Sequence, residues 1–341
     1  MNIFKKAIFF LNRPCVVLAV GKGRACVKEA CSKVLSNTLI FESGSSAKEV
    51  KRFNFFLKNS RVPILIATHV GEIPPNRDFF DGERKDASSI RELADALPHQ
   101  GFLILNYDDE TIREIKNKTI ARSLTFGFQK GADFQATDIN FNIEGTNFKI
   151  NYQGKSIPFW LKGIFGKEQI YAVLSAVCLG AVKGLNLVEI SQSLKSYQSL
   201  PGKMRLIRGI KKSLILDDSE NATAFSMIEA LGILKRIGQG RKIAVLGDVL
   251  RGGKYTAAAH ETIGEQAAET ADLLFAVGLR AKFIVQGAKR KGMRQESIFQ
   301  FNRIEQAKLA LQQEIKKGDL ILIDGSKEMK MGQVFDEIRT D

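Results

Sequence analysis

The chain has 341 residues, 44% of them hydrophobic and 26% charged, which excludes long disorder and is typical of a folded globular protein. A net charge of +14 favours an anionic partner, although a solvated basic surface is the commoner reason for such a balance. The cysteines Cys15, Cys26, Cys31 and Cys178 fit neither a zinc site nor a disulfide framework, which favours the reducing cytoplasm. No run reaches the ~18 apolar residues of a membrane span.

The first part of the chain alternates apolar runs with helical patterns. Met1–Pro14 predicts an amphipathic helix packed on the domain, because its apolar core is too short for a signal peptide. Cys15–Val20 predicts a buried strand, which ends in the loop Gly21–Arg24 before a helix from Ala25 to about Leu35. The pattern continues with strands at Thr38–Phe41, Pro63–Ala67 and Phe102–Asn106 and helices at Ala47–Leu57 and Ser88–Ala96. Such alternation predicts a mostly parallel sheet of the P-loop type.

The pattern changes twice further along. Residues 134–160 alternate polar and apolar side chains around turns, which predicts an antiparallel flap, and helices are expected at about Glu168–Lys183 and Val188–Tyr197. Leu200-Pro201-Gly202 predicts a boundary between domains 1–199 and 200–341. The second domain is expected to hold strands at Ser213–Leu216, Lys242–Gly247, Leu273–Val277, Ser297–Phe301 and Leu320–Ile323, and helices at Ala224–Arg236, Ala257–Ala271, Ala281–Lys291 and Glu305–Lys316. The predicted fold class is therefore α/β, with a Rossmann-like C-terminal domain.

Four stretches together resemble the Mur ligase family. They are Leu-Pro-Gly-Lys-Met-Arg-Leu-Ile-Arg-Gly at 200–209, Ile-Leu-Asp-Asp-Ser-Glu-Asn-Ala at 215–222, Arg-Lys-Ile-Ala-Val-Leu-Gly-Asp at 241–248 and Asp-Gly-Ser-Lys-Glu-Met-Lys-Met at 324–331. Their order and spacing are most similar to the branch that adds D-alanyl-D-alanine to UDP-muramyl tripeptide in peptidoglycan synthesis. The resemblance implies an ATP- and Mg²⁺-dependent amide ligase of the cytoplasm. It covers nearly the whole chain, and the family's N-terminal substrate domain is expected to be absent.

The resemblance places the phosphate loop at Gly21, Lys22, Gly23 and Arg24, ahead of a helix. Backbone N–H groups in such a loop can hold an anion. The family's phosphate lysine falls at Arg24 and its Mg²⁺-binding hydroxyl at Ala25, which cannot ligate a metal. Weak anion binding and a strand-to-helix turn without a ligand both stay open.

On the metal side, the resemblance retains one carboxylate and loses two other groups. Glu42 matches the family's Mg²⁺-binding glutamate and is a candidate catalytic residue, although a surface or helix-capping glutamate is the alternative. The metal-binding histidine falls at Asn76, or at Pro74 without an insertion, and His69 is a loop residue at another position. The carbamylated lysine of the family falls at Ile90, which we interpret as a packing residue.

On the nucleotide side, the resemblance assigns Gln169, Asp218 and Asn221 to nucleotide binding. It assigns Lys203, at the hinge, to the phosphates, which makes this lysine a candidate catalytic residue like Glu42. Lysine keeps the charge of the family's arginine but loses its bidentate fork. Glu168 stands in place of a histidine, and Asp324 in place of a lysine.

Three functions remain open from the sequence. The first is an amide ligase with slow turnover or altered metal use, which would take ATP and Mg²⁺. The second is a non-catalytic homologue that binds a nucleotide, a UDP-muramyl peptide precursor or a protein partner. The third is a basic nucleic-acid-binding module, which is disfavoured because no aromatic-rich RNA-binding signature accompanies the basic clusters. Loss of several charge-compensating groups weighs against ordinary phosphoryl transfer, since each contributes several kcal/mol.

Overall fold

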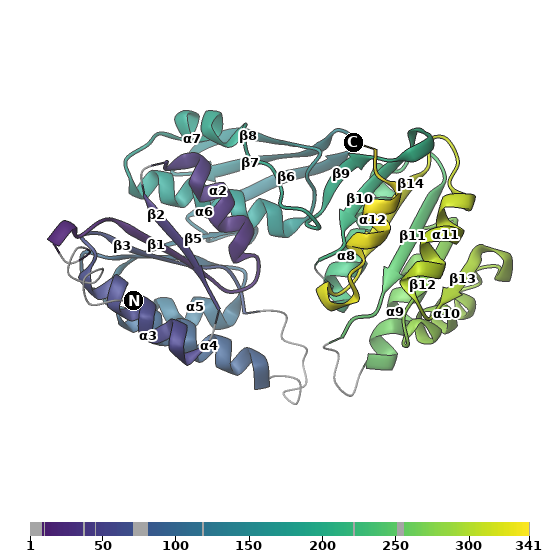
Figure 1. Cartoon of the computed structure of the whole chain (residues 1–341). Helices are drawn as coiled ribbons and strands as arrows, with labels where there is room; N and C mark the ends of the chain where they lie inside the picture. The colour runs from purple at the N-terminus through teal and green to yellow at the C-terminus, as the bar shows by residue number, and fades with distance from the viewer. Residues whose placement is uncertain are drawn as a thin grey trace. The chain divides into compact units, whose positions relative to one another are not determined.

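Two separate β-sheets organise the chain in the computed structural model, one of eight strands and one of six (Figure 1). The structure describes residues 9, 11–36, 38–44, 46–70, 81–117, 119–220, 222–250 and 256–340, with the backbone alone at 81–85. Pro74, Asn76 and Asn221 lie outside the described residues, as does most of the helix expected over Met1–Pro14.

The eight-stranded sheet has the order β2-β1-β3-β4-β5-β6-β7-β8, and the pairs from β2 to β6 are parallel. Its parallel strands are β1 (Val16–Val20), β2 (Leu39–Ser43), β3 (Pro63–Ala67), β4 (Phe102–Asn106) and β5 (Arg122–Gly127). Every residue of β1 and β3 is buried, as expected for parallel strands covered on both faces. This confirms the predicted P-loop-type parallel sheet.

Helices cover both faces of this sheet. The helices of this unit are α2 (Arg24–Val34), α3 (Ala47–Asn59), α4 (Asp81–Asp95), α5 (Glu110–Lys116), α6 (Lys167–Val182) and α7 (Leu187–Leu194). Figure 1 shows α3, α4 and α5 on one face and α2 and α6 on the other. Ile90 of α4 is buried in the core between α3, α4 and the sheet, which confirms its interpretation as a packing residue. Helix α5 and strand β5 were not predicted.

The predicted flap consists of β6 (Phe134–Asn142), β7 (Gly145–Tyr152) and β8 (Lys155–Lys162). Connections of two residues join the three strands, so the chain runs back and forth as an antiparallel meander. Strand β8 continues two residues beyond the expected end of the flap at residue 160. The flap therefore extends an otherwise parallel sheet, as the change of hydrophobic period predicted.

The six-stranded sheet has the order β13-β12-β11-β14-β10-β9, in which only β9 is antiparallel to its neighbour. Its strands are β9 (Arg205–Arg208), β10 (Leu214–Asp218), β11 (Lys242–Gly247), β12 (Leu273–Val277), β13 (Ile298–Phe301) and β14 (Leu320–Asp324). Its helices are α8 (Ala224–Ile237), α9 (Thr256–Ala268), α10 (Ala281–Arg290), α11 (Ile304–Glu314) and α12 (Gly332–Ile338). The Rossmann-like domain is confirmed, whereas β9 and α12 were not predicted.

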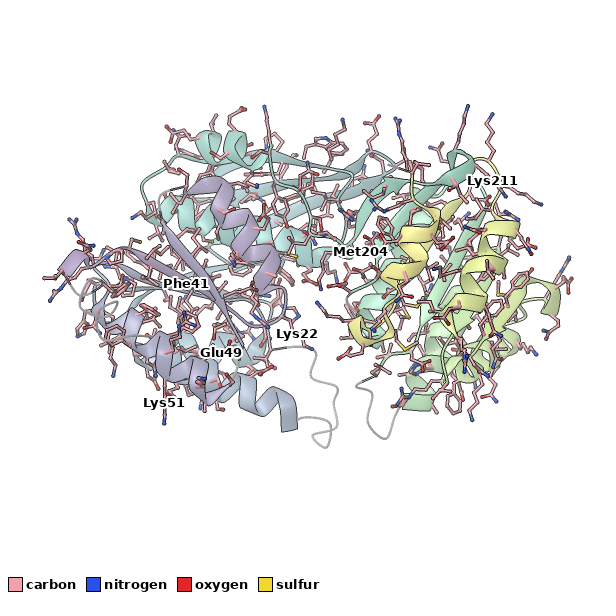
Figure 2. All side chains as sticks on the ribbon, viewed as in Figure 1. Lys22, Phe41, Glu49, Lys51, Met204 and Lys211 are labelled. Atoms are coloured by element: carbon pink, nitrogen blue, oxygen red, sulfur yellow. The ribbon has the colours of Figure 1, made fainter. Side chains whose placement is uncertain are left out.

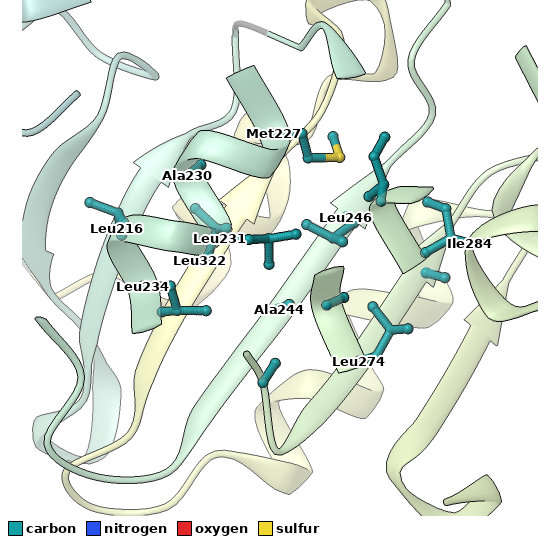
Figure 3. Close-up of a cluster of buried hydrophobic side chains, with 14 of the residues drawn as sticks. Leu216, Met227, Ala230, Leu231, Leu234, Ala244, Leu246, Leu274, Ile284 and Leu322 are labelled. Carbon is teal, nitrogen blue, oxygen red and sulfur yellow. The ribbon is translucent and has the colours of Figure 1, made fainter. Parts of the chain in front are cut away.

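Leucine side chains from the parallel strands form one core of this second sheet. Figure 3 shows Leu216, Leu246, Leu274 and Leu322 in one buried cluster, together with Ile284 of α10. All five side chains are fully buried. Fully burying a leucine contributes about 1.5–3 kcal/mol, so this cluster is a main source of the unit's stability.

Contacts divide the chain into two compact units, residues 1–139, 147–160 and 167–198, and residues 140–146, 161–166 and 199–341. The β6–β7 turn and the end of β8 thus group with the second unit, whereas the β7–β8 turn groups with the first. The domain boundary expected at residue 200 stays a prediction. Within the described part of the chain, no helix combines the length and apolar character that crossing a bilayer requires.

Candidate functional site

The loop between β1 and α2 is held in a tight turn by two glycines. Gly21 and Gly23 have φ of +93° and +74°, values that residues other than glycine rarely adopt. A β-carbon on Gly21 would lie 2.5 Å from Thr68 Oγ1, so only glycine fits there. The amide of Lys22, labelled in Figure 2, donates to the carbonyl of His69 at 2.8 Å. The loop is therefore hydrogen-bonded to the segment that follows β3.

Arg24, at the first position of α2, turns toward its own unit. Its Nη1 donates to the carbonyl of Gly21 at 3.2 Å, and its Nε lies 4.0 Å from Oε2 of Glu42 on β2. The ammonium of Lys28 lies 3.6 Å from the other oxygen of Glu42. These side chains are 35–47% exposed, so each pair contributes at most about 1 kcal/mol to stability. The main consequence of these pairs is electrostatic: Arg24 and Lys28 compensate the negative charge of the Glu42 carboxylate.

A second carboxylate lies over the loop. Glu168 occupies the first turn of α6, and a β-carbon on Gly23 would lie 2.9 Å from its Cγ and 3.0 Å from its Oε1. The same Oε1 is 3.9 Å from the thiol of Cys26, in the first turn of α2. A negative charge near a helix N-terminus is favourable because it faces the positive end of the helix dipole. The carboxylate thus lies against the loop at the N-terminus of α2.

Gln169, the neighbour of Glu168, takes part in a buried hydrogen-bond network. Its Nε2 lies 3.6 Å from the Cys26 sulfur, and its Oε1 accepts a 2.5 Å hydrogen bond from the hydroxyl of Tyr197. Burial raises the pKa of Tyr197 well above its ordinary value, so this hydroxyl is a donor at neutral pH. The structure therefore places the Gln169 amide inside the unit, and its role in nucleotide binding stays a prediction.

His69 follows β3 and is held in its neutral form. Burial, together with the positive charge of Lys22, lowers its pKa from 6.5 to about 4. Its Nδ1 is buried and has no hydrogen-bond partner among the described residues. The neighbouring Asp109 accepts from the amides of Val70 and Ile112, and burial raises the pKa of its carboxyl. His69 is therefore a half-buried loop histidine, and within the described part of the chain the hydrogen bond expected for such a residue is not made by its Nδ1.

In the second unit, Lys203 and Asp218 lie among other charged groups. The Nζ of Lys203 lies 3.4 Å from the carbonyl of Glu220, whose carboxylate pairs with Lys327 at 3.1 Å. Asp218 is buried and stands beside Asp324 in the parallel register of β10 and β14. Burial raises the pKa of Asp324 well above its ordinary value, Lys203 lowers it and Asp217 raises it. The family's lysine position therefore holds a buried carboxyl.

The described residues around Glu42 do not fit a magnesium ion. Among the described residues, no group of three or more His, Cys, Asp or Glu side chains lies close enough to hold a metal ion. Mg²⁺ requires near-octahedral oxygen ligands at short distance, whereas Glu42 is a single carboxylate beside two cations and Ala25 offers no oxygen. We therefore derive no step through a metal bound here.

The parallel sheet, the glycine loop that opens a helix and the second, Rossmann-like unit define a two-unit α/β protein. Residues 30–180 match the family model described as "Mur ligase middle domain", and residues 202–327 match "Mur ligase, glutamate ligase domain". Since the two matches together span most of the chain, the chain belongs to the Mur ligase family.

Known proteins of this family resemble the chain in sequence and in structure. The UDP-N-acetylmuramoyl-tripeptide–D-alanyl-D-alanine ligase of Bacillus subtilis (strain 168) is 25% identical over 301 residues, which are 88% of this chain and 64% of the relative. MurF from Acinetobacter baumannii superposes with a TM-score of 0.81 at 20% identity, over 97% of this chain and 78% of that one. MurF ligase from Thermotoga maritima, solved in complex with ADP, gives 0.76 at 17% identity, over 98% and 82%. The chain thus has the MurF ligase fold and spans about two thirds of the Bacillus relative.

The sequence placed the loop and Glu42 but missed two contacts of the loop. Thr68 donates to the carbonyls of Val20 and Lys22. Glu168, known from the sequence only as a replacement, touches Gly23 across 145 positions of the chain. No local pattern indicates either contact, because both depend on which strands and helices become neighbours in the sheet.

Proposed function

We propose that this chain is a MurF-like member of the Mur ligase family that binds an anionic nucleotide or UDP-muramyl peptide precursor and has a weak or altered ATP-dependent ligase activity. The observation that carries the proposal is the pairing of Glu42 with Arg24 and Lys28. The groups that resemblance assigns to the phosphate and the metal neutralise each other. Binding to an anion then rests on loop amides and on exposed cations, whose attraction fades with salt.

The ligase reaction of the family requires a carboxylate to be activated by ATP and an amine to attack the acyl phosphate. We infer that Lys22, Arg24 and Lys203 attract phosphate in this chain and that Glu42 contributes little beyond their orientation. Electrostatic stabilisation of this kind works through charges aimed at the reacting group, and removing one such group costs about 3–4 kcal/mol. Ala25 and Ile90 supply none, so we expect the chemical step to be slow.

The second candidate is a non-catalytic homologue in the cytoplasm whose role is to bind a precursor or a partner protein. The buried carboxyl of Asp324 beside Asp218 favours it, since a lysine at that position would attract phosphate and a carboxyl does not. A nucleic-acid interface is less supported. Arg290 pairs with Glu261 and Glu265, so part of the basic cluster near residue 290 is neutralised by α9.

Release of inorganic phosphate from ATP, with UDP-muramyl tripeptide and D-alanyl-D-alanine present, tests the proposal. We expect turnover well below ~1 s⁻¹, the low end of ordinary enzymes. The Bacillus subtilis relative, assayed in parallel, controls for substrate and buffer quality. Turnover near or above ~1 s⁻¹ by the unmodified chain would show that the replaced residues are dispensable and that the chain is a working ligase.

A further inference from the structure

Glu168 is the acidic side chain that the described structure places directly against the glycine loop. Its Cγ and Oε1 lie within 3.0 Å of the position that a β-carbon on Gly23 would take. Gly23 has φ of +74° and is the N-cap of α2, and no side chain caps that helix. The first turn of α2 contains no acidic residue, so the carboxylate that lies against its N-cap Gly23 comes from α6.

The charges around Glu168 determine what the loop can accept. Arg24 and Lys28, the basic residues in the first turns of α2, both lie close to Glu42. Lys22 lies near His69 and Asp109, since its charge lowers the pKa of both groups. An anion on the loop amides would consequently meet the Glu168 carboxylate at close range, while Arg24 and Lys28 already have the Glu42 carboxylate as a neighbour. Like charges at such distances repel strongly where water is partly excluded.

We propose that Glu168 is a charge gate on the loop Gly21–Arg24, which sets how tightly the loop binds phosphate-bearing ligands. The carboxylate takes the place of the ligand's charge at the N-terminus of α2. Phosphate reaches the loop amides only when Glu168 is displaced or neutralised. This inference rests on the proposed function in one respect, namely that the loop is the anion-binding surface.

Charge and bulk are separable at this position. Glutamine has nearly the same shape as glutamate, so Glu168→Gln keeps the packing on Gly23 and removes the negative charge. Glu168→Ala removes both. A gate that acts by charge predicts tighter anion binding in both variants, whereas a steric block predicts tighter binding in the alanine variant alone.

The test is a calorimetric titration of the whole chain with inorganic tripolyphosphate, without metal, at low ionic strength and neutral pH. We expect Glu168→Gln to bind at least about tenfold more tightly than the unmodified chain. Glu29→Gln is the matched control, because Glu29 lies on α2 and pairs with Lys33 at 2.8 Å, so the change in net charge is the same. The control should change affinity less than about twofold.

Each outcome decides the proposal. If Glu168→Gln and Glu29→Gln change the affinity for tripolyphosphate equally, net charge alone matters and the gate is wrong. If only Glu168→Ala binds tripolyphosphate more tightly, Glu168 acts as a steric block and the gate is also wrong. No tightening in either Glu168 variant overturns it as well, with cooperative thermal unfolding as the check that both fold. The titration uses neither ATP nor substrates, so rapid turnover in the phosphate-release assay can refute the proposed function while the gate stands, and the reverse also holds.

Discussion

Gly264→Ala is expected to lower the free energy of unfolding by about 2 kcal/mol, although alanine favours helices more than glycine does. Gly264 lies on α9, where a β-carbon would come within 1.9 Å of the carbonyl oxygen of Ile284 on α10. The contact is reciprocal, because a β-carbon on Gly287 would lie 1.9 Å from the carbonyl oxygen of Glu261. The helices must separate to admit a methyl group, and overpacking of this kind costs about 1–3 kcal/mol or more. The helix-propensity gain of about 1 kcal/mol is smaller.

Gly232→Ala is the matched control for this prediction. Gly232 lies within α8, and a β-carbon there would meet no atom within 4 Å. We expect this variant to be stabilised by up to about 1 kcal/mol, since only the propensity term changes. Urea unfolding followed by far-UV circular dichroism measures both variants. If Gly264→Ala unfolds within about 0.5 kcal/mol of the unmodified chain, the close approach of α9 and α10 is not present in solution.

The pH dependence of stability should carry a large contribution from His69. The ordinary pKa of histidine is 6.5, and burial together with Lys22 lowers that of His69 to about 4. At a pH between these values, His69 is protonated in the unfolded chain and neutral in the folded chain. Stability is therefore lost as the pH falls from 6.5 to 4, by at most about 1.4 kcal/mol per pH unit and about 3 kcal/mol in total.

A difference measurement isolates this contribution. The buried carboxyls of Asp324 and Asp109 have raised pKa values, so they favour folding at low pH and oppose the histidine in the same window. The contributions of Asp324 and Asp109 cancel when the free energy of unfolding of the His69→Gln variant is subtracted from that of the unmodified chain at each pH. We expect the difference to fall as the pH drops from 6.5 to 4. His99→Gln, at an exposed position, is the control and should leave the profile unchanged. A difference that stays constant with pH would contradict the neutral state of His69.

The sequence predicted the elements whose apolar pattern is continuous. Strands such as Pro63–Ala67 are buried on both faces, so every residue is apolar and the run is easily recognised. Strand β5 was missed because its first residues are partly exposed, and helix α5 was missed because it has only seven residues. Helix α4 begins at Asp81 rather than near Ser88, because its first turns are polar and carry no hydrophobic period.

From the sequence, only those parts of the candidate site that lie within one continuous segment could be predicted. The glycine turn of Gly21–Arg24 at the start of a helix follows from local sequence, and the structure has it. The contacts of Glu168 with Gly23 and of Glu42 with Arg24 depend on tertiary packing, which one sequence does not specify. The assignment of Lys203 to the phosphates and of Asp218 to nucleotide binding stays a prediction.

Calorimetric titration of the chain with ATP, with and without Mg²⁺, tests the central claim most directly. Because Glu42 is paired with Arg24 and Lys28, and Ala25 has no oxygen, we expect weak binding that is nearly the same with and without the metal. Any heat of binding should diminish as salt is raised from low to physiological ionic strength. Binding with a Kd at or below about 1 µM that requires Mg²⁺ would contradict the account, because it would show a metal–nucleotide site that the paired carboxylate rules out.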